Sequence, residues 1–222
     1  MDGMTPRKPA GHPLWLLLCG LTLSLCANAS APEDAATARA LVASLGRPAP
    51  ARTPFAEARF MKMLDQPLVV SGELAWLGGD RLERRVEHPN PEVSTIADGE
   101  VSQQREGREP RRFSLKRAPQ LQILLDSFVA MLGGDATRLE QAFAIQYSSI
   151  DERRWTLTLT PRDPKLVRTV SRIDIDGAGN EPHCMRMQEA DGDLAVDLLG
   201  QLATKMPAVP TRDALVALCR GG

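Results

Sequence analysis

Residues 55–89, FAEARFMKMLDQPLVVSGELAWLGGDRLERRVEHP, contain two long segments in which apolar residues alternate with polar or charged ones, on either side of a tight turn at residues 78–80. Before the turn, apolar residues and a glycine occupy every second position, with Ser71 and Glu73 between them. This period of two is typical of a strand with one face out of water. After the turn, charged residues fill alternate positions of the return strand. The stretch therefore predicts a hairpin that has one apolar face and one charged face.

More strands follow this hairpin, each bounded by turn residues such as Asp98-Gly99 and Glu106-Gly107. Residues 55–64 are predicted to form the first strand, and the hairpin over 68–88 follows it. Beyond the hairpin, the alternation predicts strands over 92–97, 100–105, 110–115, 143–147, 155–160, 171–176, 182–190 and 193–199. The apolar spacing and the Pro and Gly punctuation predict helices over 33–45, 119–132 and 135–141, and a short turn or helix within 162–170.

The order of these elements predicts an α+β fold. About ten or eleven strands are interrupted by helices, and a long antiparallel sheet with one apolar face must curl or be covered. We therefore expect a curved, incomplete antiparallel β-barrel, covered by short helices, with a concave face lined by apolar side chains.

The first 29 residues have the layout of a secretory signal peptide. Arg7 and Lys8 precede an uncharged run over 13–26, PLWLLLCGLTLSLC, and small residues follow it. The run is too short for a membrane-spanning helix, which needs roughly 20 residues. We predict cleavage after Ala29, which leaves one domain over 30–222. Both cysteines of the leader follow leucine, whereas a lipoprotein signal needs a small residue there, so lipid anchoring is the less favoured alternative.

Two cysteines remain after this cleavage, Cys184 and Cys219, and export would place them in an oxidising compartment. We predict a disulfide between them; the alternative is a pair of buried free thiols. A metal site is not predicted, because the chain has no CxxC motif and only His88 and His183 remain after processing.

Charge and motifs argue against nucleic-acid binding and catalysis. Removal of the leader takes away two of 27 basic and one of 28 acidic residues, which leaves a net charge of −2. Arginine pairs are interleaved with glutamates, as on a solvated strand face. No Gly-x-Ser-x-Gly motif occurs, and the pairs Asp174/Asp176 and Asp191/Asp193 are assigned to hairpin turns, where aspartate is common. We expect neither an enzyme nor a cofactor.

An ordered set of segments resembles the LolA and LolB family of periplasmic lipoprotein carriers, and its LolA-related branch most of all. The resemblance covers roughly residues 36–199, nearly the whole mature chain. Its segments are the amphipathic helix over 33–45, FAEARF (55–60), LVVSGEL (68–74), SGELAWLGGDRLERRVEHP (71–89), STIADGE (94–100), the helix from Pro119, RRWTLTLTPRD (153–163) and SRIDIDGAGN (171–180).

The resemblance implies a monomeric periplasmic carrier that hides acyl chains of a lipid or lipoprotein in a hydrophobic cavity. An inner-membrane exporter would donate the cargo and an outer-membrane acceptor would receive it, without nucleic acid. The residues expected to line the cavity are Leu68, Val70, Leu74 and Trp76 of the hairpin, Leu121, Leu124, Leu125 and Phe128 of the helix from Pro119, and Trp155, Leu157 and Leu159.

One position departs from the family pattern. An arginine at the turn of the first hairpin holds the lid closed in the well-known carriers, and the matching position here is Gly78, with Arg81 three residues further on. A cargo other than a lipoprotein, such as a free lipid or a glycolipid, therefore stays open. The alternative function is an envelope protein-interaction or stress-sensing module on the same fold, without lipid transport.

Overall fold

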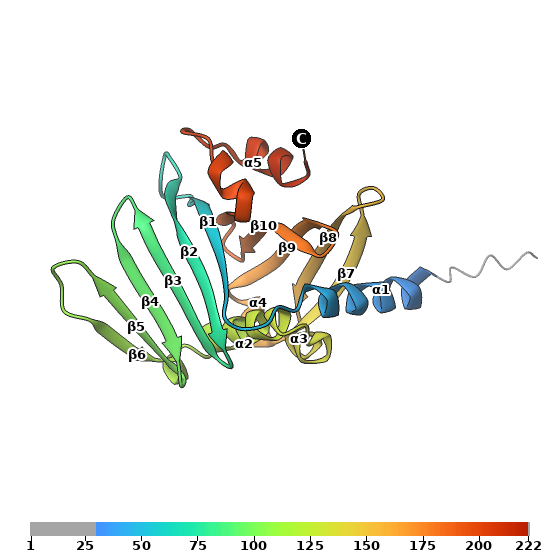
Figure 1. Cartoon of the computed structure of the whole chain (residues 1–222), viewed down its shortest axis with the longest axis horizontal. Coiled ribbons are helices and arrows are strands. Elements are labelled where there is room, and N and C mark those ends of the chain that lie inside the picture. Colours follow the sequence, from blue (N-terminus) through green and yellow to red (C-terminus); the bar gives the residue numbers. More distant parts are fainter. Residues whose placement is uncertain (1–29, 222) are drawn as a thin grey trace, which may run out of the picture.

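A computed structural model describes residues 30–221, and within this range eleven strands form one antiparallel sheet (Figure 1). The predicted signal peptide lies outside the described residues. The elements are α1 (Ser30–Leu45), β1 (Ala51–Phe60), β2 (Leu68–Gly78), β3 (Arg81–His88), β4 (Glu92–Ala97), β5 (Glu100–Arg105), β6 (Arg111–Ser114), η1 (Leu115–Arg117), α2 (Pro119–Leu132), α3 (Ala136–Ala142), β7 (Phe143–Ser149), β8 (Arg154–Pro161), α4 (Pro164–Val167), β9 (Val170–Ala178), β10 (Glu181–Glu189), β11 (Leu194–Leu199), η2 (Gly200–Lys205) and α5 (Arg212–Cys219).

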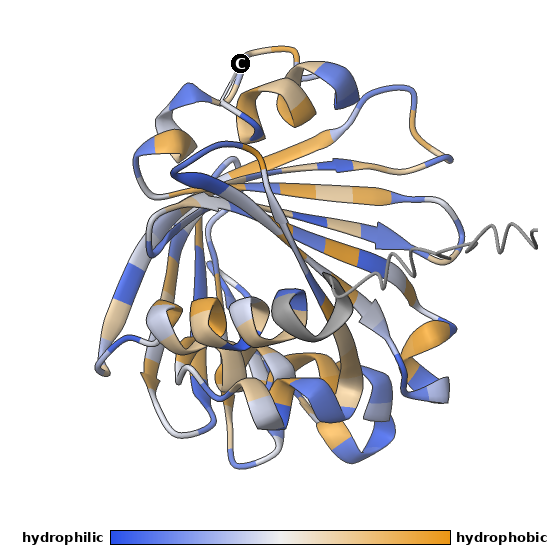
Figure 2. Ribbon diagram, turned by 90° about the vertical axis from the view of Figure 1, so that its right-hand side faces the viewer, coloured by the Kyte–Doolittle hydropathy of each residue, from blue (hydrophilic) through white to orange (hydrophobic). Residues whose placement is uncertain are grey.

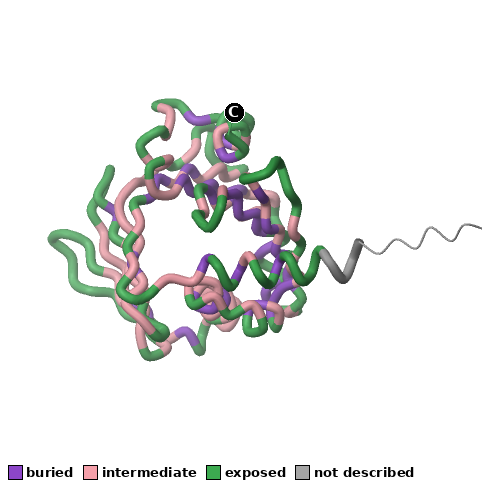
Figure 3. Tube along the Cα trace, turned by 45° about the vertical axis from the view of Figure 1, so that its right-hand side comes forward, coloured by how far each residue is buried: buried purple, intermediate pink, exposed green. Residues whose placement is uncertain are grey.

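The sheet consists of two meanders joined by one long-range pairing. Strands β1 to β6 pair in chain order, strands β7 to β11 do the same, and β1 pairs with β11 through contacts such as Phe55 with Leu199. Strands β6 and β7 remain the two edges, so the sheet curves but does not close (Figure 3). The predicted α+β class and incomplete antiparallel barrel are confirmed.

Side chains alternate between two faces of this sheet, as the mixture of hydrophobic and hydrophilic residues along the strands in Figure 2 illustrates. We call the face that packs against α1 to α4 the concave face; it includes Leu157 of β8 and Ile175 of β9. We call the opposite face the convex face; it includes Cys184 of β10 and Leu198 of β11, and it packs against η2 and α5.

Each face has its own hydrophobic core. The concave core joins Ala38 and Val42 of α1, Ala130 of α2 and Leu139 of α3 to the buried residues of β7 to β9. The convex core centres on Leu215 of α5, which is fully buried, and includes the disulfide between Cys184 and Cys219. That disulfide was predicted, and the structure contains it.

Local signals in the sequence set several element boundaries. Helix α2 starts at Pro119, whose missing N–H costs nothing at a helix N-terminus, and it stops before Gly133. Asp98 and Gly99 both have positive φ angles, 53° and 72°, as the type I′ turn of a two-residue hairpin requires. None of the helices in residues 30–221 is long and apolar enough to cross a membrane.

Two local predictions were wrong. The first strand spans 51–60 rather than 55–64, because its partners on β11 and β2 end opposite Phe60 and Arg59, and the chain turns away after them. Asp174 and Asp176 lie within β9 rather than in a turn. They are buried on the convex face, where Arg186 of β10 pairs with both of them.

Gly72 is required by a close approach of two backbones at the bulge between β2 and β3. A Cβ at this position would lie 1.9 Å from the carbonyl oxygen of Arg85. Gly72→Ala should therefore lower the free energy of unfolding by about 1–3 kcal/mol, the usual range for overpacking. Urea unfolding measures this loss, with Ser71→Ala on the opposite face as the control. Equal stability of the two variants would contradict the strain.

Candidate functional site

The concave face is filled by helices over one half of the sheet. Trp155, Leu157 and Leu159 of β8 are at most 3 % exposed, and they belong to one core with α1, α2 and α3. Leu124 and Phe128 of α2 pack against this same core. The structure therefore brings the predicted β8 residues together with two of the four predicted helix residues.

The other half of the concave face is less covered. Four apolar residues of β2 lie on this face, as the alternation predicts: Leu68, Val70, Leu74 and Trp76. Val70 pairs with Glu57 of β1, and Glu57 pairs with Asp197 of β11. The residues on either side of Asp197, Val196 and Leu198, face the convex core, so Asp197 and the residues paired with it lie on the concave face. Leu68 is 51 % exposed, and the other three are half-buried. Leu121 and Leu125 of α2 are also half-buried. Whether these residues contact a ligand remains a prediction.

A group of charged residues, which we call the inner charge cluster, lies between the two halves. Its members are Glu57, Arg59, Arg84, Glu189 and Asp197. Arg84 donates to Glu57 at 2.8 Å and stacks over the ring of Phe55 at 4.8 Å. Arg59 donates to Glu189. These two ion pairs satisfy four of the five charged groups.

Asp197 is the fifth group, and it differs from the others. It is 7 % exposed, faces Glu57 across the β1–β11 ladder, and takes part in no hydrogen bond or ion pair among the described residues, so its carboxylate oxygens keep a small exposure to solvent. Burial, reinforced by the negative charge of Glu57, raises the pKa of Asp197 to about 8, although Arg84 and Arg59 act against this shift. Burial also raises the pKa of Glu189.

Sequence reasoning missed this cluster. One signal was present: Asp197 is the single charged residue in the strand sequence LAVDLL. A lone charge within an apolar strand indicates either an ion pair or a functional group. Its neighbours could not be identified from the sequence, because Glu57, Arg84 and Asp197 come from three strands and meet only through the β1–β11 and β2–β3 registers.

The raised pKa of Asp197 makes a prediction about stability. Between about pH 4 and pH 8 the folded protein holds a proton that the unfolded chain releases, so this contribution to stability is lost as the pH rises. Asp197→Asn removes the effect. We expect the variant to gain stability relative to wild type from pH 5 to pH 8, with a limiting slope of about 1.4 kcal/mol per pH unit. Urea unfolding at the two pH values measures this gain, and parallel pH profiles would contradict it.

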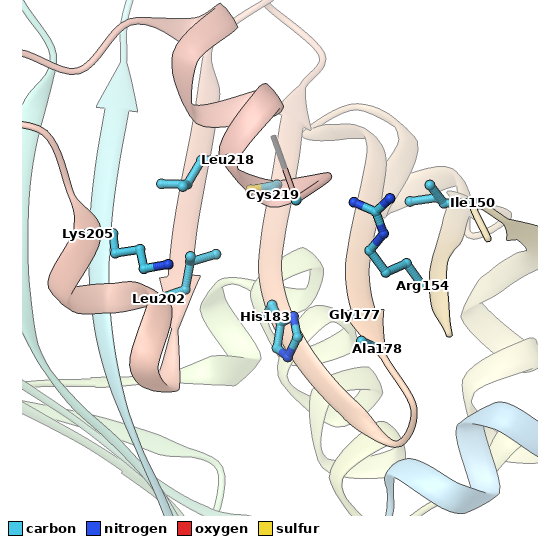
Figure 4. Close-up of a pocket in the computed structure, with 10 residues that line it drawn as sticks. Ile150, Arg154, Gly177, Ala178, His183, Leu202, Lys205, Leu218 and Cys219 are labelled. Atoms are coloured by element: carbon cyan, nitrogen blue, oxygen red, sulfur yellow. The ribbon is translucent and has the colours of Figure 1, made fainter. Parts of the chain in front are cut away.

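A pocket of about 320 Å³ lies elsewhere, between the sheet and the two C-terminal helices. Figure 4 shows Leu202 and Lys205 of η2 and Leu218 of α5 around it, with His183 and Arg154 from the sheet. Arg154 is already bound to Asp151 and to the backbone oxygen of Arg220. Of the residues predicted from sequence to form a site, this pocket contains Cys219 of the disulfide.

The turn of the first hairpin contains no arginine latch at position 78. Gly78 has a φ angle of 97°, and Arg81 donates to the backbone oxygen of Leu77 in its own hairpin at 3.3 Å. Arg81 therefore binds within the hairpin, where it supports the turn.

Solved structures similar to this chain include a LolA superfamily protein, a lipoprotein-sorting protein domain and a MucA/MucB complex. A LolA superfamily protein from Nitrosomonas europaea is 13 % identical, with 76 % of this chain and 92 % of that chain covered and a TM-score of 0.41. A putative outer membrane lipoprotein-sorting protein domain from Vibrio parahaemolyticus is 9 % identical, with 84 % and 99 % covered and a TM-score of 0.39.

The MucB protein in the Pseudomonas aeruginosa MucA/MucB complex is 15 % identical, with 82 % of this chain and 60 % of that chain covered and a TM-score of 0.37.

No curated protein matches this chain. The family model for the outer membrane lipoprotein carrier protein LolA-like family matches residues 29–222. This match extends over nearly all of the chain, and the protein therefore belongs to the LolA-like family.

Proposed function

We propose that this protein is a periplasmic carrier that shields the acyl chains of a lipid or lipoprotein on its concave face. A leader cleaved after Ala29 would deliver residues 30–222 to the periplasm as one domain. The carrier would act as a monomer between an inner-membrane donor and an outer-membrane acceptor. It binds and releases its cargo and performs no covalent chemistry.

The difference in coverage between the two halves of the concave face is the observation that supports this proposal best. Leu157 and Leu159 on β8 are at most 1 % exposed, whereas the apolar residues of β2 on the same face are exposed or half-buried. Apolar side chains gathered on one incompletely covered face are typical of a binding surface. A hydrocarbon chain would complete the packing there.

Burial of hydrocarbon supplies enough free energy for this task. Each CH₂ removed from water contributes about 0.8 kcal/mol, so roughly 12 CH₂ groups contribute on the order of 10 kcal/mol before the costs of binding. This is comparable with the free energy that holds an acyl chain in a bilayer, so transfer needs only a modest difference in affinity between carrier and membrane.

A charge on the apolar part of the concave face tests the proposal. Leu74→Glu places a carboxylate at a half-buried position of β2 that solvent still reaches, so the fold should survive. We expect the affinity for a fluorescent fatty acid to fall at least about tenfold, equivalent to roughly 1.4 kcal/mol.

The control variant is Ser102→Glu, on the opposite face beside Arg112 of β6. It should bind the fluorescent fatty acid as wild type does, and both variants should keep the wild-type circular dichroism spectrum. A wild-type protein that binds no fluorescent fatty acid would contradict the carrier function and favour the interaction module.

Export is tested separately. We predict that the mature protein begins at Ser30, because small residues precede this bond and the uncharged run ends shortly before it. N-terminal sequencing of protein recovered from the periplasm of an expressing cell checks this. A chain that keeps residues 1–29, or one that is acylated at Cys26, would contradict the prediction.

A further inference from the structure

The unpaired carboxyl group of Asp197 lies at the boundary between the filled and the uncovered half of the concave face. Strand β11 separates β10, whose Met185 and Met187 pack against the concave core, from β1 and β2. Val196 and Leu198 face the convex core, so the side chain of Asp197 between them faces the concave side. More than nine-tenths of Asp197 is buried.

The charges around this carboxyl group do not balance. Glu57, Glu189 and Asp197 provide three carboxylates, and Arg59 and Arg84 provide two guanidinium groups. Arg84 is held by Glu57 and by the ring of Phe55, and Arg59 is held by Glu189. When Asp197 is ionised, the inner charge cluster therefore carries one negative charge that no described residue neutralises.

Burying an unpaired carboxylate is costly, so proteins rarely keep one without a partner. The cost falls if a cation arrives with a ligand. We propose that Asp197 and Glu57 bind the protonated primary amine of an amphiphile whose hydrocarbon chain lies along the apolar residues of β2. This inference rests on the proposed carrier function and adds the headgroup chemistry of the cargo.

The geometry favours a small ammonium group. Asp197 and Glu57 are directly opposed residues on neighbouring antiparallel strands, and the Cβ atoms of such pairs lie about 4.5–5.5 Å apart. An ammonium group has three donors and can reach both carboxylates at once. A bound metal ion is less suited, because no group of three or more metal-ligating side chains was found among residues 34–221.

Ionisation of Asp197 would accompany binding. Because burial raises its pKa, Asp197 holds a proton in the free protein at pH 7, and an arriving ammonium group would displace that proton. Glu57, Arg84 and Arg59 are the charged groups that act on it, and Glu189 is held by Arg59. Amine binding should therefore release a proton to the buffer.

The test compares three ligands of equal chain length, decylamine, decanol and decanoic acid, by displacement of the neutral fluorescent dye N-phenyl-1-naphthylamine at pH 7. Wild type should bind decylamine about tenfold more tightly than decanol. Asp197→Asn should abolish this preference and leave the affinity for decanol unchanged. Asp213→Asn, an exposed position in the first turn of α5, is the matched control and should behave as wild type.

Calorimetry on wild type in two buffers of different ionisation enthalpy adds a measurement that needs no variant. Decylamine should release close to one proton, and decanol none. Equal affinities for decylamine and decanol together with no proton release would overturn the amine site while leaving the carrier function intact. Failure of all three ligands to displace the dye would contradict the carrier function and the inference together.

Discussion

Arg186→Met should lower the free energy of unfolding by about 3–5 kcal/mol, the range observed when one partner of a buried ion pair is removed. Arg186 of β10 is 6 % exposed and donates to both oxygens of Asp176, at 2.8 and 3.1 Å. Its third nitrogen lies 3.5 Å from Asp174. Methionine fills a similar volume, so the loss would come from the charge and not from a cavity.

Asp176 would bear most of this loss. It is fully buried, and without Arg186 its remaining partner is the hydroxyl of Thr156 at 2.6 Å. Asp174 keeps a hydrogen bond from Thr158 and an ion pair with Arg172 at 2.9 Å. A second substitution, Asp176→Asn, should therefore recover part of the stability, because it removes the unpaired charge.

Arg172→Met is the matched control for Arg186→Met. Arg172 also pairs with Asp174, but its side chain is 56 % exposed, so its removal should cost less than about 1 kcal/mol. Urea unfolding of the single and double variants measures all three effects. Losses of similar size for Arg172→Met and Arg186→Met would contradict the role assigned to burial.

Loss of the disulfide should have the second largest effect. The Cys184–Cys219 bond closes a loop over a sequence separation of 35 residues, which corresponds to about 3–4 kcal/mol in the chain-entropy model. Both sulfurs lie in the convex core beside Leu215, so the bond also holds α5 against β10. Replacing both cysteines with alanine should therefore destabilise the protein and expose α5 first.

Urea unfolding of wild type with and without a reducing agent measures this contribution. Reduction should lower the unfolding midpoint of wild type and leave that of the double alanine variant unchanged. Hydrogen exchange should show that amides of α5 lose protection before those of β8 and β9. A wild-type midpoint that does not respond to reduction would contradict the prediction.

Elements with strong local signals were predictable from the sequence. The predicted helix over 119–132 coincides with α2, because Pro119 and Gly133 mark its two ends. The strands over 92–97 and 100–105 coincide with β4 and β5, because the Asp98-Gly99 turn separates them. The cysteine pair was predictable because only two cysteines remain beyond the leader.

Features that depend on distant pairing were not predictable. The end of β1 was misplaced because β11, which lies more than a hundred residues further along the chain, pairs with β1 only as far as Phe60. The burial of Asp174 and Asp176 was missed for a different reason: it depends on ion pairs with Arg186 in the next strand, and without a visible partner these two residues resemble turn aspartates. The inner charge cluster does depend on long-range register, because β1 and β11 pair across most of the chain.

The most direct test of the carrier function is native mass spectrometry of the mature protein, purified from the periplasm without detergent. The account predicts wild-type protein with bound species of lipid or lipoprotein mass, and a Leu74→Glu variant that is folded but largely free of them. Wild-type protein that is free of lipid and bound to a protein partner would contradict the account.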